Sequence, residues 1–176
     1  MFIHLKDLVS KGTIRVEGTE DLTDVLPKKG DLLGFGPLHV QLEARNQDGR
    51  AEVSGELKID VEQSCSRCLA PVRQSLTIPF HETFVKGEEK DFDPSDEEEV
   101  EDDEEEVLYV SDDRIELKPI LAEVVLMGLP FIPLCSADCQ GLCPVCGNNR
   151  NEQACGCKQD KVDPRLAGLA DFFKND

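Results

Sequence analysis

The chain has 176 residues, with 37 aspartates and glutamates against 19 lysines and arginines, which gives a formal net charge of −18. It is long enough for one ordinary domain with an appendage, and 39% apolar residues suffice for a core. The first residues, MFIHLKDLVSKG, contain no basic start, no long apolar run and no small-residue cleavage site, so they predict neither a signal peptide nor a membrane span. We therefore expect the protein to be cytosolic.

Alternating apolar and polar residues predict a β-rich body over residues 1–87. The alternation runs through Leu38–Arg45 and Arg50–Glu62, and the intervening NQDG has turn composition, so these two runs predict an antiparallel hairpin. A third alternating run, Val72–Phe80, contains Pro79, which predicts an edge strand or a bulge because proline cannot donate to a strand ladder.

Shorter elements are expected near the N-terminus. Thr13–Glu17 and the FIHL stretch at the start are predicted to add strands. Thr19–Leu26 is predicted as a short helix with Thr19 as its cap. The body is therefore expected to be a mostly antiparallel sheet.

One segment accounts for most of the acidity. Glu88–Glu106 holds fourteen acidic residues and one lysine, a net charge of −13, which leaves −5 for the rest of the chain. Such runs bury too little apolar surface to offset the entropy of ordering, so residues 88–111 are predicted to be a disordered linker or loop. The simpler interpretation is that the run is a solvated spacer. The more specific interpretation is that its negative charge covers the positive charge of a basic partner.

Helical spacing appears after the acidic run, and the apolar residues that carry it are Leu117, Ile120, Leu121, Val124 and Met127. Residues 112–134 are thus predicted as a helix and an extended segment that pack on the sheet. Residues 135–176 are predicted as a cysteine-rich zinc segment that ends in a short helix from Asp163. The expected fold class is α+β: a mostly antiparallel sheet with a packed helix and a C-terminal cysteine-rich zinc-binding segment.

The eight cysteines fall into four pairs with the spacing of metal ligands. In a reducing cytosol such pairs indicate metal binding more often than disulfides. Zinc takes four thiolates in a tetrahedron, and two intervening residues let one turn present both sulfurs to the same ion. The pairs are Cys65 with Cys68, Cys135 with Cys139, Cys143 with Cys146, and Cys155 with Cys157.

The spacing favours two zinc sites. The CPVCG turn at Cys143 and Cys146 is the most specific signal, and Cys155 and Cys157 follow closely enough to complete that tetrahedron. The CSRC pair then needs two further ligands, and Cys135 and Cys139 are those that remain, which would close a long loop. Other partitions stay open, as does a single zinc ion with four free cysteines.

Catalytic signals are few. Cys139, Cys143 and Cys146 have the CxxxCxxC spacing of radical enzymes, but only thirty residues follow, too few for the barrel that such an enzyme needs. An iron–sulfur centre of another kind is not excluded, because thiolates also suit iron. The three histidines have no neighbouring nucleophile, and no phosphate-binding loop is present. We therefore expect no enzymatic activity and no small-molecule substrate.

Five stretches that span most of the chain form a recognisable pattern: CSRCLAPV, LPFIPLC, CxxDCxGLCPxCGxN, the closing CxC and DPRLAGLA. Together they resemble the bacterial YceD-like family, the large ribosomal RNA subunit accumulation proteins. The resemblance implies a non-enzymatic cytosolic factor that is needed for normal accumulation of large-subunit (23S) rRNA and acts in ribosome synthesis.

The charge distribution bears on the partner. RNA is bound chiefly through phosphate neutralisation, and a body of charge −5 offers no general basic field. A modest cluster for RNA contact exists at Arg150, Lys158, Lys161 and Arg165. We expect a ribosomal protein or an assembly factor as the partner, and no membrane. The alternatives are a zinc-ribbon module that binds RNA directly and a redox-switched zinc chaperone.

Overall fold

The computed structural model describes residues 1–26, 30–87 and 107–157. The chain divides into two compact units. The body unit comprises Met1–Gln63 and Arg73–Phe131, and the cysteine unit comprises Ser64–Val72 and Ile132–Asp176. The acidic run at 88–106, the predicted C-terminal helix and three residues of the expected RNA-contact cluster (Lys158, Lys161 and Arg165) lie outside the described residues.

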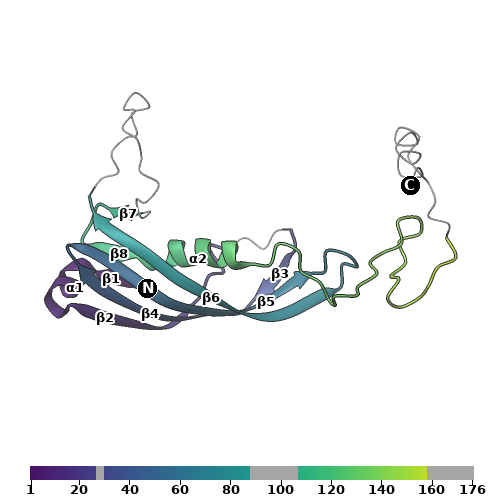
Figure 1. Ribbon diagram of the computed structural model, residues 1–176, viewed down its shortest axis with the longest axis horizontal. Helices are drawn as coiled ribbons and strands as arrows, with labels where there is room; N and C mark the ends of the chain where they lie inside the picture. The colour runs from purple at the N-terminus through teal and green to yellow at the C-terminus, as the bar shows by residue number, and fades with distance from the viewer. Residues whose placement is uncertain (27–29, 88–106, 158–176) are drawn as a thin grey trace, which may run out of the picture. The chain divides into compact units, whose positions relative to one another are not determined.

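The body unit is built on a six-stranded sheet (Figure 1). The strand order is β2-β4-β5-β6-β7, and β3 also pairs with β5. These strands are β2 (Thr13–Glu20), β3 (Leu32–Phe35), β4 (Leu38–Gln47), β5 (Arg50–Ser64), β6 (Pro71–Lys86) and β7 (Val107–Val110). A separate two-stranded sheet pairs β1 (Phe2–His4) with β8 (Arg114–Glu116).

The predicted hairpin is confirmed, and its turn explains it. β4 and β5 are antiparallel from His39 opposite Lys58 to Gln47 opposite Arg50. The two residues between them, Asp48 and Gly49, both have positive φ, at 49° and 83°. A two-residue turn with positive φ at both positions matches the twist of the strands that it joins, and aspartate followed by glycine favours it.

The helix predicted after the acidic run is also confirmed. α2 spans Leu117–Gly128 and lies along the sheet (Figure 1). Its residues Leu117, Leu121 and Val125, spaced four apart, are buried in one core with Phe80 and Phe84 of β6. The core therefore forms where the apolar stripe of the helix covers the inward face of the strands.

The prediction of a mostly antiparallel sheet was wrong, because the sheet is mixed. β7 runs parallel to β6, with Thr83 opposite Val107 and Lys86 opposite Val110. Alternation along a strand indicates which residues face the core but not the direction of its partner. A parallel pair needs a crossover of a dozen or more residues, and the chain between Lys86 and Val107 has that length. β7 occupies the end of the range predicted as an acidic linker or loop, 88–111.

Two short elements near the N-terminus also differ from expectation. Thr19 and Glu20 belong to β2 and pair with His39 and Leu38, so the helix predicted at Thr19–Leu26 is wrong. Only a single turn follows, closed by the Leu26 N–H donating to the Leu22 carbonyl at 2.8 Å. A seven-residue helix, α1 (Leu5–Lys11), was not predicted, because so short an element buries only Leu8 and shows no periodicity.

The close approach of β4 and β5 at Gly55 can be tested by substitution. A Cβ added to Gly55 would lie 2.1 Å from the Gln41 carbonyl oxygen and 2.9 Å from the Leu42 Cα, both backbone atoms of β4. We expect Gly55→Ala to lower the free energy of unfolding by more than about 1 kcal/mol, because the strands must separate to admit the methyl group. Gly36→Ala is the control, since its Cβ meets nothing closer than 3.8 Å. Equal unfolding midpoints in urea for the two variants would contradict the expectation.

Candidate metal centres

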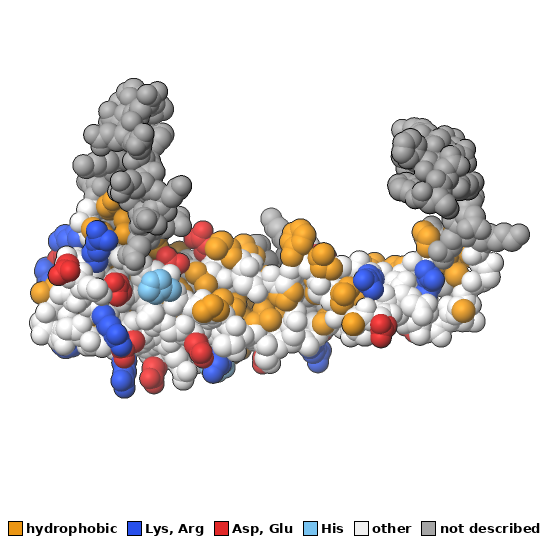
Figure 2. All heavy atoms as spheres, viewed as in Figure 1, with side chains coloured by type: hydrophobic (Ala, Val, Ile, Leu, Met, Phe, Trp, Pro, Cys, Tyr) orange, Lys and Arg blue, Asp and Glu red, His pale blue; other side chains and the backbone are white. Residues whose placement is uncertain are grey.

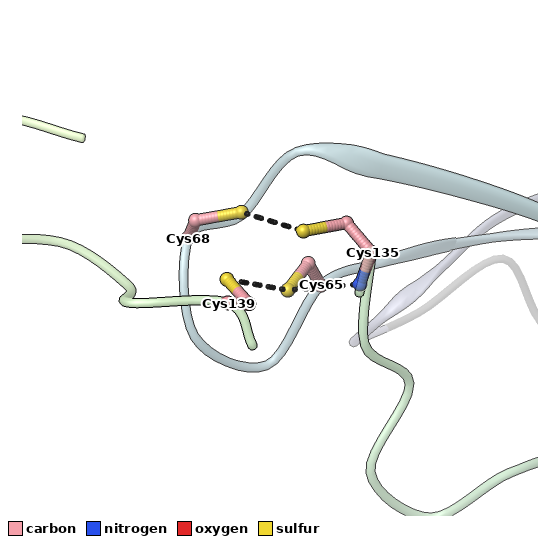
Figure 3. A group of neighbouring side chains, drawn as sticks. All are labelled: Cys65, Cys68, Cys135 and Cys139. Atoms are coloured by element: carbon pink, nitrogen blue, oxygen red, sulfur yellow. Dashed lines mark hydrogen bonds between the residues drawn. The ribbon is translucent and has the colours of Figure 1, made fainter. Parts of the chain in front are cut away.

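Four cysteines from two distant stretches of the chain meet in the cysteine unit, and we call them the first tetrad: Cys65, Cys68, Cys135 and Cys139. Their Sγ atoms all lie within 4.8 Å of one another. The Sγ of Cys65 is 3.8 Å from that of Cys139, and the Sγ of Cys68 is 3.6 Å from that of Cys135 (Figure 3). A disulfide bond is about 2.05 Å long, so the four thiols are not crosslinked.

The separations suit a single tetrahedral ion. With Zn–S bonds of about 2.3 Å, the sulfurs of a ZnS₄ tetrahedron lie about 3.8 Å apart. In an iron–sulfur cluster the four thiolates are divided among two or four irons, so the cluster core holds those on different irons further apart. The first tetrad therefore has the dimensions of a mononuclear site, in which its sulfurs face one another (Figure 3).

A tight turn between β5 and β6 presents the first two sulfurs. The N–H of Cys65 donates to the Ala70 carbonyl at 2.8 Å, and the N–H of Leu69 donates to the Cys65 carbonyl at 2.9 Å. Leu69 closes the turn with a positive φ of 62°, a conformation that side chains other than glycine rarely adopt. The turn thus places Cys65 and Cys68 on the same side, as two-residue spacing requires.

Backbone bonds hold the second stretch against this turn. The Ser66 N–H donates to the Pro133 carbonyl at 2.8 Å, and the Leu142 N–H donates to the Arg67 carbonyl at 3.0 Å. The Arg67 guanidinium in turn donates to the Cys139 carbonyl at 2.8 Å. These contacts bring together residues about seventy positions apart in the chain. The first tetrad therefore joins two segments that are distant in the sequence.

Local N–H groups favour negative charge on two of the four sulfurs, those of Cys65 and Cys139. Burial raises the pKa of Cys65, but backbone N–H groups of Arg67, Cys135 and Cys68 outweigh it and lower the pKa to about 6. Burial likewise raises the pKa of Cys139, yet the Asn151 amide, 3.3 Å from its sulfur, helps to lower it below the usual value. The thiolate, which is the form that binds metal, is therefore stabilised at both positions.

The second tetrad comes from one continuous stretch and consists of Cys143, Cys146, Cys155 and Cys157. Its Sγ atoms also lie within 4.8 Å of one another. The Gly147 N–H donates to the Cys143 carbonyl at 2.8 Å, and Gly147 has a φ of 75°, which glycine adopts without strain. Backbone N–H groups of Cys146 and Val145 lower the pKa of Cys143 to about 6.

The two tetrads differ in exposure. In the first, Cys65, Cys68 and Cys139 are buried, and only Cys135 is exposed. In the second, Cys143 alone is buried, Cys146 is exposed, and the other two are half-buried. Solvent and small reagents therefore reach the second tetrad more easily than the first.

The structure brings the eight cysteines together in the two groups that their spacing favours. Sequence reasoning missed Arg67 and Asn151, which contact Cys139 from outside the tetrad. The position of Arg67 between Cys65 and Cys68 was a signal that could have identified it. No pattern in the sequence pointed to Asn151. Arg150, expected to contact RNA, is half-buried, and its backbone N–H donates to the Gly141 carbonyl at 2.9 Å.

A family model described as "Large ribosomal RNA subunit accumulation protein YceD" matches residues 53–173. The matched range holds both tetrads and covers well over half of the chain. The chain belongs to the YceD family. The resemblance predicted from the cysteine motifs is thus confirmed.

Named relatives of this YceD-family chain come from bacteria and a plant. An uncharacterized protein of Mycobacterium tuberculosis is 34% identical over 121 residues, which covers 69% of this chain and 55% of the relative. Uncharacterized protein YlbN of Bacillus subtilis is 26% identical over 171 residues, 94% of this chain and 91% of the relative. The Zea mays "Large ribosomal RNA subunit accumulation protein YCED homolog 1, chloroplastic" is 23% identical over 178 residues, 89% of this chain and 58% of the relative.

The chain spans only 55–61% of the length of the mycobacterial relatives that it matches. No solved structure matches it. Among the helices in the described part of the chain, none combines the length and the apolar character needed to cross a membrane.

Proposed function

We propose that this YceD-family protein is a non-enzymatic cytosolic factor of ribosome biogenesis that supports the accumulation of large-subunit (23S) rRNA. The observation that carries the proposal is the family match over residues 53–173, whose description names that role. The Zea mays relative carries the same description in its own name. The protein acts by binding a ribosomal protein or an assembly factor.

Two zinc ions, one in each tetrad, stabilise the cysteine unit. In the first tetrad, the Sγ–Sγ separations of 3.6 and 3.8 Å match the edge of a ZnS₄ tetrahedron, and in the second the four Sγ atoms lie within 4.8 Å of one another. A site of four thiolates with no open position is typical of structural rather than catalytic zinc. The ion in the first tetrad would hold the turn between β5 and β6 against Cys135 and Cys139, and the ion in the second would close the later stretch on itself.

The charge of the cysteine unit favours a protein partner over direct contact with RNA. Within its described residues the only lysines or arginines are Arg67 and Arg150, which Asp138 and Glu152 balance. Each zinc ion with four thiolates adds a net charge of −2. Over the described part of this unit, phosphate groups would therefore meet a neutral to negative surface, whereas RNA binding depends on neutralising them.

The ratio of large-subunit to small-subunit rRNA tests the role. Cells that lack the gene are expected to show a lowered ratio, which the wild-type chain restores. A chain with Cys65, Cys68, Cys135 and Cys139 all changed to serine is expected to fail, because the cysteine unit then loses its zinc and its fold. An unchanged ratio in cells without the gene would overturn the proposed function. Zinc analysis of the purified, reduced protein tests the metal separately, with two equivalents per chain expected.

A further inference from the structure

Strand β2 lies at one edge of the sheet in the body unit. It pairs with β4 on one side, and within the described part of the chain no strand pairs with its other side. An unpaired edge exposes a row of N–H and C=O groups that can accept a further strand. The eight residues of β2 contain no proline, and their register with β4 has no bulge, so two features that commonly protect an edge are missing.

The hairpin of β4 and β5 determines which backbone groups of β2 point outward. Its two-residue turn makes Gln47 and Arg50 a hydrogen-bonded pair, so odd-numbered residues of β4 bond to β5 and even-numbered residues bond to β2. The N–H of Asn46 accordingly donates to the Gly12 carbonyl, just before β2, at 3.0 Å. Even-numbered residues of β2 lie opposite even-numbered residues of β4. The outward backbone groups therefore belong to the odd-numbered residues of β2: Thr13, Arg15, Glu17 and Thr19.

The residues that precede β2 in the chain pack on the core face of the sheet. Leu8 of α1 is buried in the core, and Met1 packs against it. Met1 approaches even-numbered residues of β2, because its amino group is 3.2 Å from the Glu20 carboxylate and its Cε would lie 3.2 Å from a Cβ on Gly18. Figure 2 shows acidic and basic side chains along the lower left margin, where Figure 1 draws β2. The edge is thus a polar surface of mixed charge.

The sequence of β2 is complementary to itself when two copies pair antiparallel. In a two-fold pair one residue lies opposite its own copy, because the outward groups of odd-numbered residues must meet those of odd-numbered residues. Centred on Val16, the pairing places Arg15 opposite Glu17 in both directions. It also places Thr13 opposite Thr19, so all the outward backbone groups find partners. A pairing centred on Arg15 or on Glu17 would instead place like charges opposite each other, which is destabilising.

The neighbours of the two charged residues favour this pairing. Glu17 lies opposite the neutral Gln41 of β4. Arg15 is 76% exposed, and its Nε donates to Glu43 at 3.3 Å. Arg45 also binds Glu43, at 2.6 Å, so Glu43 keeps a cation when Arg15 turns toward Glu17 of a second copy. Opposite charges directly across an antiparallel strand pair are stabilising.

We propose that β2 is the interface of a two-fold symmetric homodimer, in which two copies pair antiparallel through Thr13–Thr19 and form one continuous sheet. A single strand pair buries a small area, so the dimer is expected to be transient and to exchange with the monomer. The proposal goes beyond the proposed function and does not depend on it, because it uses only the body unit and involves no metal ion and no rRNA.

Sedimentation equilibrium of the full-length protein over a concentration series tests the proposal. Near physiological ionic strength, charges more than about 8 Å apart are largely screened, so the acidity of the whole chain does not mask the effect of the edge. The wild type is expected to dimerise as its concentration rises. Arg15→Glu and Glu17→Arg, made singly, each place like charges opposite each other and are expected to weaken dimerisation roughly tenfold. A mixture of the two variants is expected to restore it, since each charge then meets its opposite.

Glu56→Arg is the matched control for charge. It changes the net charge as Glu17→Arg does, but Glu56 is exposed on β5, which has strands on both sides. Its dimerisation is expected to equal that of the wild type. A wild type that stays monomeric at every concentration would overturn the proposal. So would a dimer that both charge variants leave intact, or a mixture of Arg15→Glu with Glu17→Arg that stays monomeric.

The backbone contribution is tested at Thr19. Thr19→Pro removes an outward N–H and leaves the bonds to β4, because proline is tolerated on an edge strand where its N–H would face solvent. Thr19→Ala removes the same side chain and keeps the N–H. The proline variant is expected to dimerise more weakly than the alanine variant. Equal dimerisation of the two would show that side chains alone make the contact, and it would refute the pairing of strands.

Discussion

Changing Cys65 to serine is expected to remove one of two zinc equivalents and to unfold much of the cysteine unit. Cys65 is fully buried, and its sulfur lies 3.8 Å from that of Cys139 in the later stretch of chain. Structural zinc sites of this kind contribute about 10–16 kcal/mol of binding free energy, which is also folding free energy. A serine hydroxyl is a poor ligand beside three thiolates, so most of that contribution is lost.

Zinc content by mass spectrometry and thermal unfolding measure this effect. Ser66→Ala is the control, because Ser66 lies in the same turn with an exposed side chain, and its backbone bond to Pro133 remains. Cys157→Ser gives a second comparison: it is expected to lose the other zinc equivalent and keep the first, since the tetrads share no cysteine. Two zinc equivalents and an unchanged midpoint in Cys65→Ser would refute the first site.

Changing Gly141 to alanine is expected to damage the first tetrad without altering any cysteine. Gly141 has a φ of 72°, and a Cβ there would lie 2.8 Å from the Arg67 carbonyl oxygen. That oxygen accepts the Leu142 N–H at 3.0 Å, which ties the later chain to the CSRC turn. Strain and clash together are expected to lower the free energy of unfolding by about 2 kcal/mol or more and to weaken zinc retention.

Competition with a chromogenic chelator measures zinc retention, and the Gly141→Ala variant is expected to release one equivalent faster than the wild type. Gly156→Ala is the matched control within the same unit, since no atom lies within 4 Å of its added Cβ and its φ is not positive. The same release rates for Gly141→Ala, Gly156→Ala and the wild type would show that the contact with Arg67 does not support the site.

Local signals were enough for several elements. The turn at Asp48 and Gly49 needs only its own backbone conformation, so the hairpin of β4 and β5 could be predicted from four residues. The presence of α2 followed from apolar residues three and four apart. The pairing of Cys65 with Cys68, and of Cys143 with Cys146, followed from two-residue spacing, because one turn determines where both sulfurs point.

Apart from the grouping of Cys65 and Cys68 with Cys135 and Cys139, which the spacing favoured, contacts between distant segments were beyond the sequence. Thr19 has helix-cap character, but pairing with β4 keeps Thr19 and Glu20 in β2. β7 lies parallel to β6 because of where a long connection returns, which alternation cannot reveal. Arg67 and Asn151 contact Cys139 only once the chain has folded back.

The amino-acid sequence by itself determined that this protein carries four thiol pairs, a hairpin, a packed helix and the motifs of its family, because each depends on neighbours a few residues away. The tertiary structure decided between the partitions of those pairs that the spacing had left open, which way β7 runs, and that Met127 and Phe131 remain exposed. These features depend on closing loops of many residues, and the stability of such closures comes from packing and hydrogen bonds between segments that no local pattern encodes.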